Sequence, residues 1–265
     1  AKAKGEIIDN ISENGNLILN KDDKFFDFLS KKAEKKGVKV TSFSAKKKAD
    51  IFLGKIKKVK NHYRLKIFLQ KEAFYFDTMY STRNFINNFL SCITVLHILN
   101  LDLKKIGKKF INFTFPQGRG DITIIRKFKK RFKFVDESYN ASPLSMKSAI
   151  KNINSYEIKE KGKKIVFLGD MLELGSKSRK LHRELSLTIN RSNIDKVFVH
   201  GKFIKETFNL LSESKKGKVF GNLKEAYSHL SKILRNNDLL MVKGSNATGL
   251  NQFSKNIKKG QINAV

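Results

Sequence analysis

Val135-Asp-Glu-Ser-Tyr-Asn-Ala-Ser-Pro-Leu-Ser-Met146 and Lys164-Ile-Val-Phe-Leu-Gly-Asp-Met-Leu-Glu-Leu-Gly175 are the two stretches of sequence that decide the fold. Each begins as a buried strand and continues into a polar loop that leads toward a helix. In open α/β sheets, ligands bind just beyond the carboxyl ends of the strands. The two stretches therefore predict an α/β domain whose ligand cleft lies where both strands end.

Strands and helices alternate regularly around these stretches. The predicted strands are 132–137, 164–169, 195–200, 217–220 and 238–243, and the predicted helices are 143–154, 178–190, 202–211, 223–235 and 249–258. Ser142 as N-cap and Pro143 in the first turn specify the start of the first helix. Alternation of this kind indicates a doubly wound, mostly parallel, Rossmann-like sheet.

The upstream part of the chain has a less regular pattern. It predicts strands at 16–20 and 38–43, a hairpin of 63–69 with 73–77, and helices at 24–36, 85–96 and 103–110. The segment 113–120 contains one of the two prolines and two glycines, which is typical of a connection between domains. We therefore expect two domains, at residues 1–117 and 118–265.

Composition limits the compartment of the protein. Cys92 is the one cysteine, so no disulfide framework is possible and a reducing compartment is expected. The longest apolar run, 89–101, is too short to span a membrane, and no signal peptide opens the chain. We expect a cytoplasmic protein with no membrane span.

The formal net charge of +31 admits a role in nucleic-acid binding. The lysines are, however, spread along the chain together with abundant Asn, Ile and Phe, a composition typical of AT-rich codons. No arginine-rich stripe and no recognisable nucleic-acid-binding motif occurs in the sequence. These features favour a solvated basic surface, which also attracts anionic small molecules.

The loop 136–140 combines an acid pair, a hydroxyl, an aromatic ring and an amide. Such acids can hold a metal or a ribose, and Tyr139 can stack on a base. An ordinary helix-capping loop has a similar composition, so the residues alone leave both interpretations open. Gly169-Asp-Met-Leu-Glu-Leu-Gly175 is by itself only a glycine-bounded turn.

Both stretches resemble hallmark segments of the Mur ligase family, and most closely those of its D-alanyl-D-alanine-adding members. The family motif Asp-(Asp/Glu)-Ser-Tyr-Asn-Ala-x-Pro-x-Ser-Met is present, with Ser142 where asparagine is usual, and Gly-Asp-Met-Leu-Glu-Leu-Gly matches in full. The resemblance implies the remainder of a central ATPase domain followed by a Rossmann-like C-terminal domain. It also implies an ATP- and Mg²⁺-dependent amide ligase that joins D-alanyl-D-alanine to UDP-N-acetylmuramoyl-tripeptide through an acyl phosphate.

The resemblance further implies roles for individual residues. Those implied to bind ATP are Asn84, Asn88, Arg119, Asp136, Glu137, Tyr139 and Asn140. Asn84 stands where a histidine is usual, and Arg119 would reach the phosphates with its planar fork. Those implied to bind the second substrate are Asp170, Leu172, Glu173, Lys243 and Ser245; Asn246 replaces the usual arginine after Val242-Lys-Gly-Ser245, and His182 also matches a family position.

Ala1-Lys-Ala-Lys-Gly-Glu-Ile7 resembles the Ala-Lys-x-Glu-Ile segment of the family. The resemblance implies that Lys4 is carbamylated, catalytic and a ligand of Mg²⁺. A free ammonium repels Mg²⁺, whereas a carbamate is an oxygen-rich anion that a hard cation accepts. A family-like Asn20-Lys-Asp-Asp23 supports this alignment.

The phosphate-binding loop Gly-x-x-x-x-Gly-Lys-(Ser/Thr) does not occur in the 265 residues. In Mur ligases it precedes the carbamylated lysine, so we expect an N-terminally truncated, monomeric fragment that is inactive alone. Three alternatives remain open. They are another Mur or folylpolyglutamate-type ligase, a non-catalytic dipeptide-binding module, and a basic nucleic-acid-binding protein.

Overall fold

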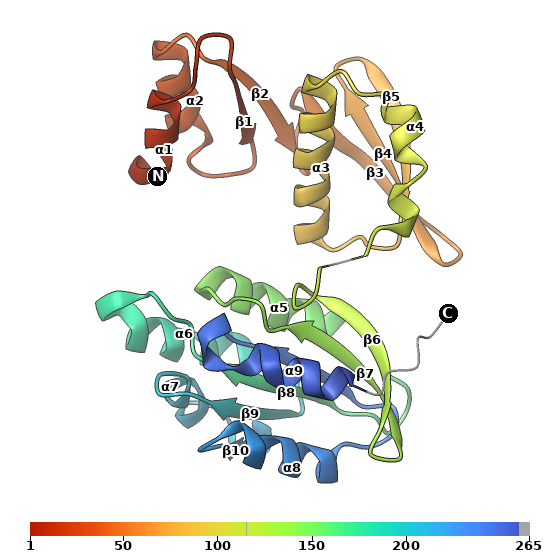
Figure 1. Cartoon of the computed structure of the whole chain (residues 1–265), viewed down its shortest axis with the longest axis vertical. Helices are drawn as coiled ribbons and strands as arrows, with labels where there is room; N and C mark the ends of the chain where they lie inside the picture. The colour runs from red at the N-terminus through yellow and green to blue at the C-terminus, as the bar shows by residue number, and fades with distance from the viewer. Residues whose placement is uncertain (115, 260–265) are drawn as a thin grey trace. The chain divides into compact units, whose positions relative to one another are not determined.

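The computed structural model describes residues 1–114 and 116–259. The chain divides into two compact units, Ala1–Phe113 and Thr114–Val265 (Figure 1). The division falls after residue 113, where the sequence placed it after residue 117. Phe115, within the predicted connection, lies outside the described residues. No helix among the described residues is long and apolar enough to cross a membrane.

The first unit is built on a mixed five-stranded sheet in the order β1-β2-β3-β4-β5. Strands β1 to β3 are parallel, and β3, β4 and β5 form an antiparallel meander. The elements are α1 (Lys2–Asp9), β1 (Asn16–Asn20), α2 (Phe26–Lys35), β2 (Lys39–Ser44), β3 (Ile51–Val59), β4 (His62–Leu69), β5 (Glu72–Thr78), α3 (Arg83–Ile98) and α4 (Leu103–Gly107). Helix α1 was not predicted from the sequence.

Helix α3 supplies most of the apolar cover of this sheet. Thr82 is its N-cap and accepts a hydrogen bond from the Phe85 amide. Residues at helical spacing, including Phe85, Phe89 and Ile93, are buried on one face. The Phe76 ring of β5 meets Phe89 edge-on, with 5.5 Å between centroids. The apolar residues whose helical spacing predicted this helix are therefore largely those that its buried face contains.

The second unit is a six-stranded sheet in the order β10-β9-β8-β11-β7-β6. All its neighbouring strands are parallel except β6, which is antiparallel to β7. The elements are β6 (Asp121–Lys127), β7 (Lys130–Glu137), α5 (Pro143–Ser155), β8 (Lys164–Gly169), α6 (Ser178–Asn190), β9 (Lys196–His200), α7 (Ile204–Asn209), β10 (Lys216–Val219), α8 (Leu223–Ile233), β11 (Leu239–Lys243) and α9 (Leu250–Lys258). The doubly wound prediction is confirmed.

Strand β6 was missed from the sequence. It joins β7 through a two-residue turn in which Phe128 and Lys129 both have positive φ, of 56° and 58°. Two-residue hairpin turns with positive φ normally contain Asn or Gly, and these residues are the signal by which such turns are predicted. Because the turn residues here are bulky, the sequence carried no signal of a hairpin.

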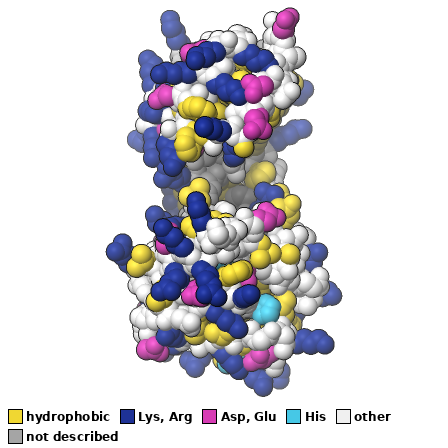
Figure 2. All heavy atoms as spheres, turned by 90° about the vertical axis from the view of Figure 1, so that its left-hand side faces the viewer, with side chains coloured by type: hydrophobic (Ala, Val, Ile, Leu, Met, Phe, Trp, Pro, Cys, Tyr) yellow, Lys and Arg dark blue, Asp and Glu magenta, His cyan; other side chains and the backbone are white. Residues whose placement is uncertain are grey.

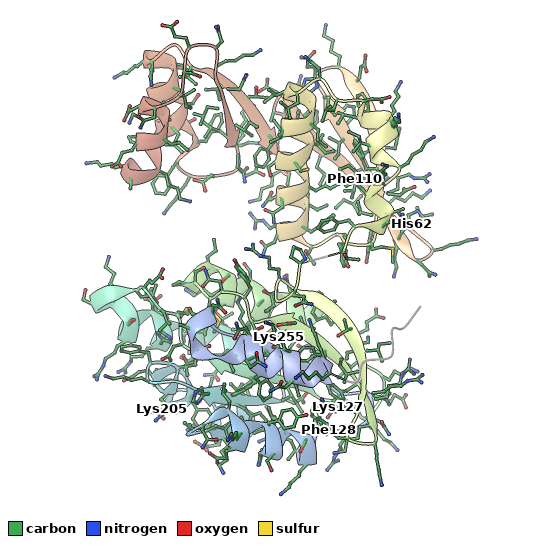
Figure 3. All side chains as sticks on the ribbon, viewed as in Figure 1. His62, Phe110, Lys127, Phe128, Lys205 and Lys255 are labelled. Carbon is green, nitrogen blue, oxygen red and sulfur yellow. The ribbon has the colours of Figure 1, made fainter. Side chains whose placement is uncertain are left out.

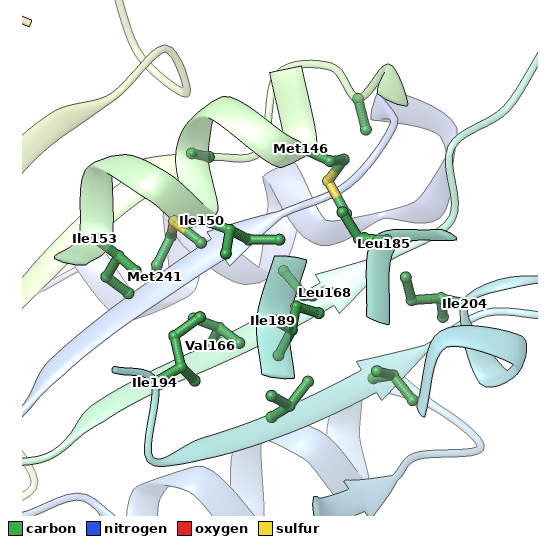
Figure 4. Close-up of a cluster of buried hydrophobic side chains, with 14 of the residues drawn as sticks. Met146, Ile150, Ile153, Val166, Leu168, Leu185, Ile189, Ile194, Ile204 and Met241 are labelled. Carbon is green, nitrogen blue, oxygen red and sulfur yellow. The ribbon is translucent and has the colours of Figure 1, made fainter. Parts of the chain in front are cut away.

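Two apolar clusters fill the faces of the second sheet. One lies against α5, α6 and α7 (Figure 4) and includes Met146, Ile150, Leu185, Ile189 and Met241. The other involves α8 and α9 and includes Phe167, Leu230 and Phe253. All six positions of β8 are buried, as expected for a parallel strand covered on both faces. This rigid sheet fixes the positions at which the polar loops leave it.

Several lysines donate hydrogen bonds to carbonyls at the ends of helices, a role that was not predicted from the sequence. The Lys36 ammonium donates to the carbonyls of Ile8 and Asp9 at the end of α1. Lys127, labelled in Figure 3, does the same for Asn256 and Lys259 at the end of α9. Helix ends leave carbonyls without intrahelical partners, and these ammonium groups satisfy some of them. Part of the positive charge therefore holds the fold together.

Candidate functional site

Three polar loops meet at one edge of the second sheet. They follow β7, β8 and β11, and β11 lies between the other two strands. In the parallel register, Lys243 of β11 pairs with Glu137 of β7 and with Leu168 of β8. The carboxyl ends of the three strands are therefore level, which brings together the loops at 138–142, 170–175 and 244–249. This is the sheet edge at which the sequence placed the polar loops.

Lys243 ties the first loop to the central strand. Its side chain is 2% exposed, and its ammonium donates to the Asn140 carbonyl at 2.9 Å and lies 3.3 Å from Glu137 Oε2. Burial lowers the pKa of Lys243, and the Glu137 carboxylate opposes that shift. An ammonium buried in this way needs partners of opposite or partial negative charge. Its effect is to fix the backbone that carries Tyr139 and Asn140.

Asp136 is also turned inward. Its Oδ1 accepts hydrogen bonds from the Ser138 amide, at 3.1 Å, and from the Ser138 hydroxyl, at 2.6 Å. Its Oδ2 lies 2.8 Å from the ammonium of Lys258 on α9. Sequence reasoning missed Lys258 because it stands far along the chain, on a helix with no motif of its own. Asp136 and Lys258 together anchor the start of the loop.

Arg119 and Tyr139 form the exposed part of the same loop region. The Arg119 Cζ lies 4.2 Å from the centroid of the Tyr139 ring, which is 50% exposed. The Tyr139 amide donates to the Gly118 carbonyl at 3.0 Å. Gly118 has φ of +76°, and a Cβ there would lie 3.0 Å from the Tyr139 nitrogen. Glycine at 118 thus permits the close approach that stacks Arg119 on Tyr139.

Asp170, in the loop after β8, binds backbone amides through its carboxylate. Its carboxylate accepts hydrogen bonds from the amides of Lys202, Phe203 and Ile204, at 2.9, 3.0 and 2.7 Å. Gly201 precedes them with φ of +140°, and a Cβ there would lie 2.5 Å from Asp170 Oδ1. The buried carboxylate therefore holds the segment before α7 against the loop after β8.

His182 of α6 also contacts the loop after β8. It is fully buried; its Nδ1 lies 2.7 Å from the Ser178 carbonyl, and its Nε2 accepts the Met171 amide at 2.9 Å. Only the neutral imidazole with hydrogen on Nδ1 satisfies both bonds. Because Nε2 is an acceptor here, its 4.0 Å separation from Asp170 Oδ1 is not an ion pair. His182 is a structural residue in this geometry.

Ser245 joins the loops after β8 and β11. Its hydroxyl accepts the Leu172 amide at 3.0 Å and lies 3.4 Å from the Ala141 carbonyl. Leu172 is half-buried and Glu173 is exposed, with φ of 62°. The side chains of Tyr139, Asn140 and Glu173 are thus presented to solvent at this edge, while Lys243 and Ser245 lie beneath them.

The remaining predicted site residues lie in the first unit. Lys4 is exposed on α1, and Asn84 and Asn88 are exposed one turn apart on α3. Both acids of the Asn20–Asp23 segment make local hydrogen bonds. Asp22 accepts from the Ser44 hydroxyl at 2.6 Å and the Ala45 amide at 2.8 Å, and Asp23 accepts from the Phe25 amide at 2.8 Å. Among the described residues, His, Cys, Asp and Glu side chains form no group of three or more that is suited to a metal.

Comparison with known proteins places the chain in a family. Residues 122–246 match the Mur ligase, glutamate ligase domain, and residues 1–96 match the Mur ligase middle domain. A UDP-N-acetylmuramoyl-tripeptide–D-alanyl-D-alanine ligase of Rickettsia prowazekii is 28% identical over 96% of this chain and 55% of its own length. The enzyme of the same name from Buchnera aphidicola subsp. Baizongia pistaciae is 30% identical over 98% of this chain and 54% of its own.

Solved structures agree with this assignment at the level of the fold. MurF from Acinetobacter baumannii has a TM-score of 0.79 at 21% identity, covering 97% of this chain and 55% of that one. MurF ligase from Thermotoga maritima, in complex with ADP, has a TM-score of 0.74 at 20% identity, covering 98% and 58%. The chain spans about half the length of the curated relatives it matches. With matches in both its units, the chain belongs to the Mur ligase family.

Proposed function

We propose that this chain takes part in joining D-alanyl-D-alanine to UDP-N-acetylmuramoyl-tripeptide, as an ATP-dependent amide ligase of peptidoglycan precursor synthesis. The observation that carries the proposal is the meeting of both motif loops at one sheet edge, bridged by Ser245 and held by Lys243. Relatives that bear this activity in their names align along nearly the whole chain. The proposal includes a cytoplasmic, monomeric protein with no nucleic-acid partner.

The reaction has two steps. The γ-phosphoryl group of ATP passes to a carboxylate oxygen of the tripeptide, and ADP leaves. The amine of D-alanyl-D-alanine then attacks the carbonyl carbon of the acyl phosphate, loses a proton and expels phosphate. Such steps are catalysed chiefly by positioning and by charge stabilisation at the phosphoryl oxygens. Arg119 is suited to that task because it is exposed beside Tyr139 and its planar guanidinium carries several N–H donors that match phosphate oxygens.

The other roles follow from exposure and anchoring. Glu137, Tyr139 and Asn140 would face the nucleotide, with Asp136 holding their loop. Asn88 of α3 would contact adenine, and Asn84 of the same helix would also bind ATP. The second substrate would bind along Leu172 and Glu173, above Asp170, Lys243 and Ser245.

Lys4 would act as a carbamate that holds Mg²⁺. Its side chain is exposed on α1, so the amine is accessible to carbon dioxide. Mg²⁺ accepts oxygen ligands and keeps several waters, so it needs few ligands from the protein. When bound, the cation would neutralise charge on the phosphoryl group.

A chimera tests the proposal. The part of the Rickettsia prowazekii relative that precedes its aligned stretch is joined to Ala1, and phosphate release is measured with ATP, the UDP-tripeptide and D-alanyl-D-alanine. We expect release only when all three are present. Lys4→Met should reduce it by about 100-fold or more, since it removes the metal-holding group, whereas Lys2→Met on the same helix should not.

Other outcomes identify the alternatives. Release that depends on glutamate in place of the dipeptide would indicate another Mur or folylpolyglutamate-type ligase. Dipeptide binding without phosphate release would indicate a binding module. DNA binding that weakens steeply with salt, with no ligand-dependent release, would favour the nucleic-acid alternative. Figure 2 argues against the last, because Lys and Arg on the face shown are scattered and form no stripe.

A further inference from the structure

A cavity of about 510 Å³ lies in the first unit, and none of the residues assigned above lines it. Strand β5, at one edge of the sheet, forms one wall through residues 73–77. The other wall is formed by Leu103, Lys104 and Gly107 of α4 and by Lys108, the residue that follows it. Figure 3 shows His62 on the β4 side, and Phe110 on the segment that follows α4.

The floor of the cavity is apolar. It includes Phe74, Phe76, Leu103 and Ile111. A Cβ on Gly107 would lie 3.0 Å from the Phe76 ring, so glycine is what allows α4 to approach the strand this closely. The volume and the aromatic lining fall in the range of small-molecule sites.

The rim of the cavity is basic. Lys104 and Lys108 are one helical turn apart and so lie on the same side of the helix. No hydrogen bond or ion pair joins either ammonium to another residue in the described part of the chain. His62 Nε2 is buried and, among the described residues, has no hydrogen-bond partner. Asp77 Oδ1 lies 3.5 Å from it, which is too long for a strong hydrogen bond.

Asp77 does not cancel this positive charge. It is the one acid among the described residues that line the cavity. Arg64 binds it through two parallel hydrogen bonds of 2.8 and 2.9 Å. The Arg64 guanidinium holds the pKa of the Asp77 carboxyl below its usual range, so the acid remains ionised and neutralised. The two lysines then leave a net positive field over an apolar floor.

We propose that this cavity binds a small anion with a flat apolar body, of the class of aryl phosphates and aryl carboxylates. The anionic group would lie between the Lys104 and Lys108 ammonium groups. The flat body would rest on the apolar lining of the cavity, where Phe74 is partly exposed. Every residue involved belongs to the first unit, so the site stands independently of the proposed ligase activity.

Calorimetric titration of the 265-residue chain tests the proposal with phenyl phosphate, phenol and inorganic phosphate. We expect saturable binding of phenyl phosphate, about tenfold or more tighter than that of either part, because both the charge and the ring are recognised. Benzoate should compete with it. Equal affinity for phenyl phosphate and inorganic phosphate would overturn the proposal, because the apolar floor would then contribute nothing.

Matched variants locate the site. The pair Lys104→Met with Lys108→Met should weaken phenyl phosphate binding by about tenfold, because two exposed ion pairs with the ligand are lost. The pair Lys31→Met with Lys35→Met removes the same charge at the same spacing from α2 and should leave binding unchanged. Ala73→Trp should block the cavity. Thermal unfolding checks that each variant is folded, and equal loss in both lysine pairs would refute the site.

Discussion

The Arg119 guanidinium lies over the Tyr139 ring, with 4.2 Å between Cζ and the ring centroid. A cation–π contact of this kind is worth about 0.5–1 kcal/mol at an exposed site and favours side-chain conformations that keep Arg119 beside Tyr139. The several N–H donors of the guanidinium can bind phosphate oxygens in pairs. The contact therefore links Arg119, near the start of the second unit, to the loop that follows β7.

Replacing Arg119 should therefore affect phosphate recognition. Arg119→Ala is expected to weaken ATP binding by about tenfold and adenosine binding much less, because a charge-assisted contact to phosphate is lost. Calorimetry of the 265-residue chain with both ligands measures the difference. Arg126→Ala, an exposed arginine on β6, is the control and should change neither. Equal losses for ATP and adenosine would exclude a phosphate contact.

Lys243 should be important for stability as well as for the loop. Lys243→Met removes the ammonium that meets Glu137 and the Asn140 carbonyl, and leaves those groups without their partner. We expect a loss of about 3 kcal/mol in the free energy of unfolding, measured by urea denaturation. Lys255→Met, at an exposed position of α9, should cost almost nothing. Similar losses in the two variants would show that the contacts of Lys243 with Glu137 and Asn140 do not stabilise the fold.

The lowered pKa of Lys243 predicts a pH dependence with a definite sign. Burial makes the folded protein release this proton at a lower pH than the unfolded chain does. Between the folded pKa and the ordinary value of 10.5, the unfolded chain binds more protons, so stability rises with pH. The unfolding free energy of the unmodified chain, minus that of Lys243→Met, should therefore increase as pH rises toward 10.5. A flat or falling difference would refute the assigned environment.

His182 should be essential to the loop after β8. His182→Ala leaves the Met171 amide without its acceptor in a buried site and opens a cavity. The expected cost is about 3 kcal/mol or more, and the Met171 amide should lose protection in hydrogen exchange. His97→Ala, on α3 of the first unit, serves as the comparison. Unchanged protection at Met171 would mean that the loop is held by other contacts.

Asp170 and Glu173 lie in the same loop, and we expect the first to contribute to stability and the second to ligand binding. Asp170→Ala deprives three amides of their acceptor and should destabilise the protein by about 2–3 kcal/mol. Glu173→Ala should leave stability unchanged, because Glu173 is exposed, and should weaken D-alanyl-D-alanine binding. Denaturation and dipeptide titration of both variants decide this. Normal dipeptide binding by Glu173→Ala would remove that residue from the site.

The sequence predicted most of the second unit because its signals are local. The strand at 164–169 and the helix at 178–190 were predicted with the bounds of β8 and α6. Strand β6 escaped prediction because its turn, Phe128-Lys129, uses residues that rarely adopt positive φ. Helix α1 escaped because its eight residues bury only Gly5 and Ile8, too few to make an apolar face visible.

By itself, the sequence determined the alternation of strands and helices, the edge where the polar loops lie, and the motif residues in them. All three features depend on the hydrophobic period and on short runs of adjacent residues. Both can be recognised in the sequence without knowledge of the fold. Only the tertiary structure decided which polar side chains face solvent and which hold the loops. Asp170 meets amides 32 to 34 residues away, and Glu137 meets Lys243 at a separation of 106. Partners that distant are chosen by the packing of the sheet, because each buried polar group must find an acceptor or donor wherever the fold brings one.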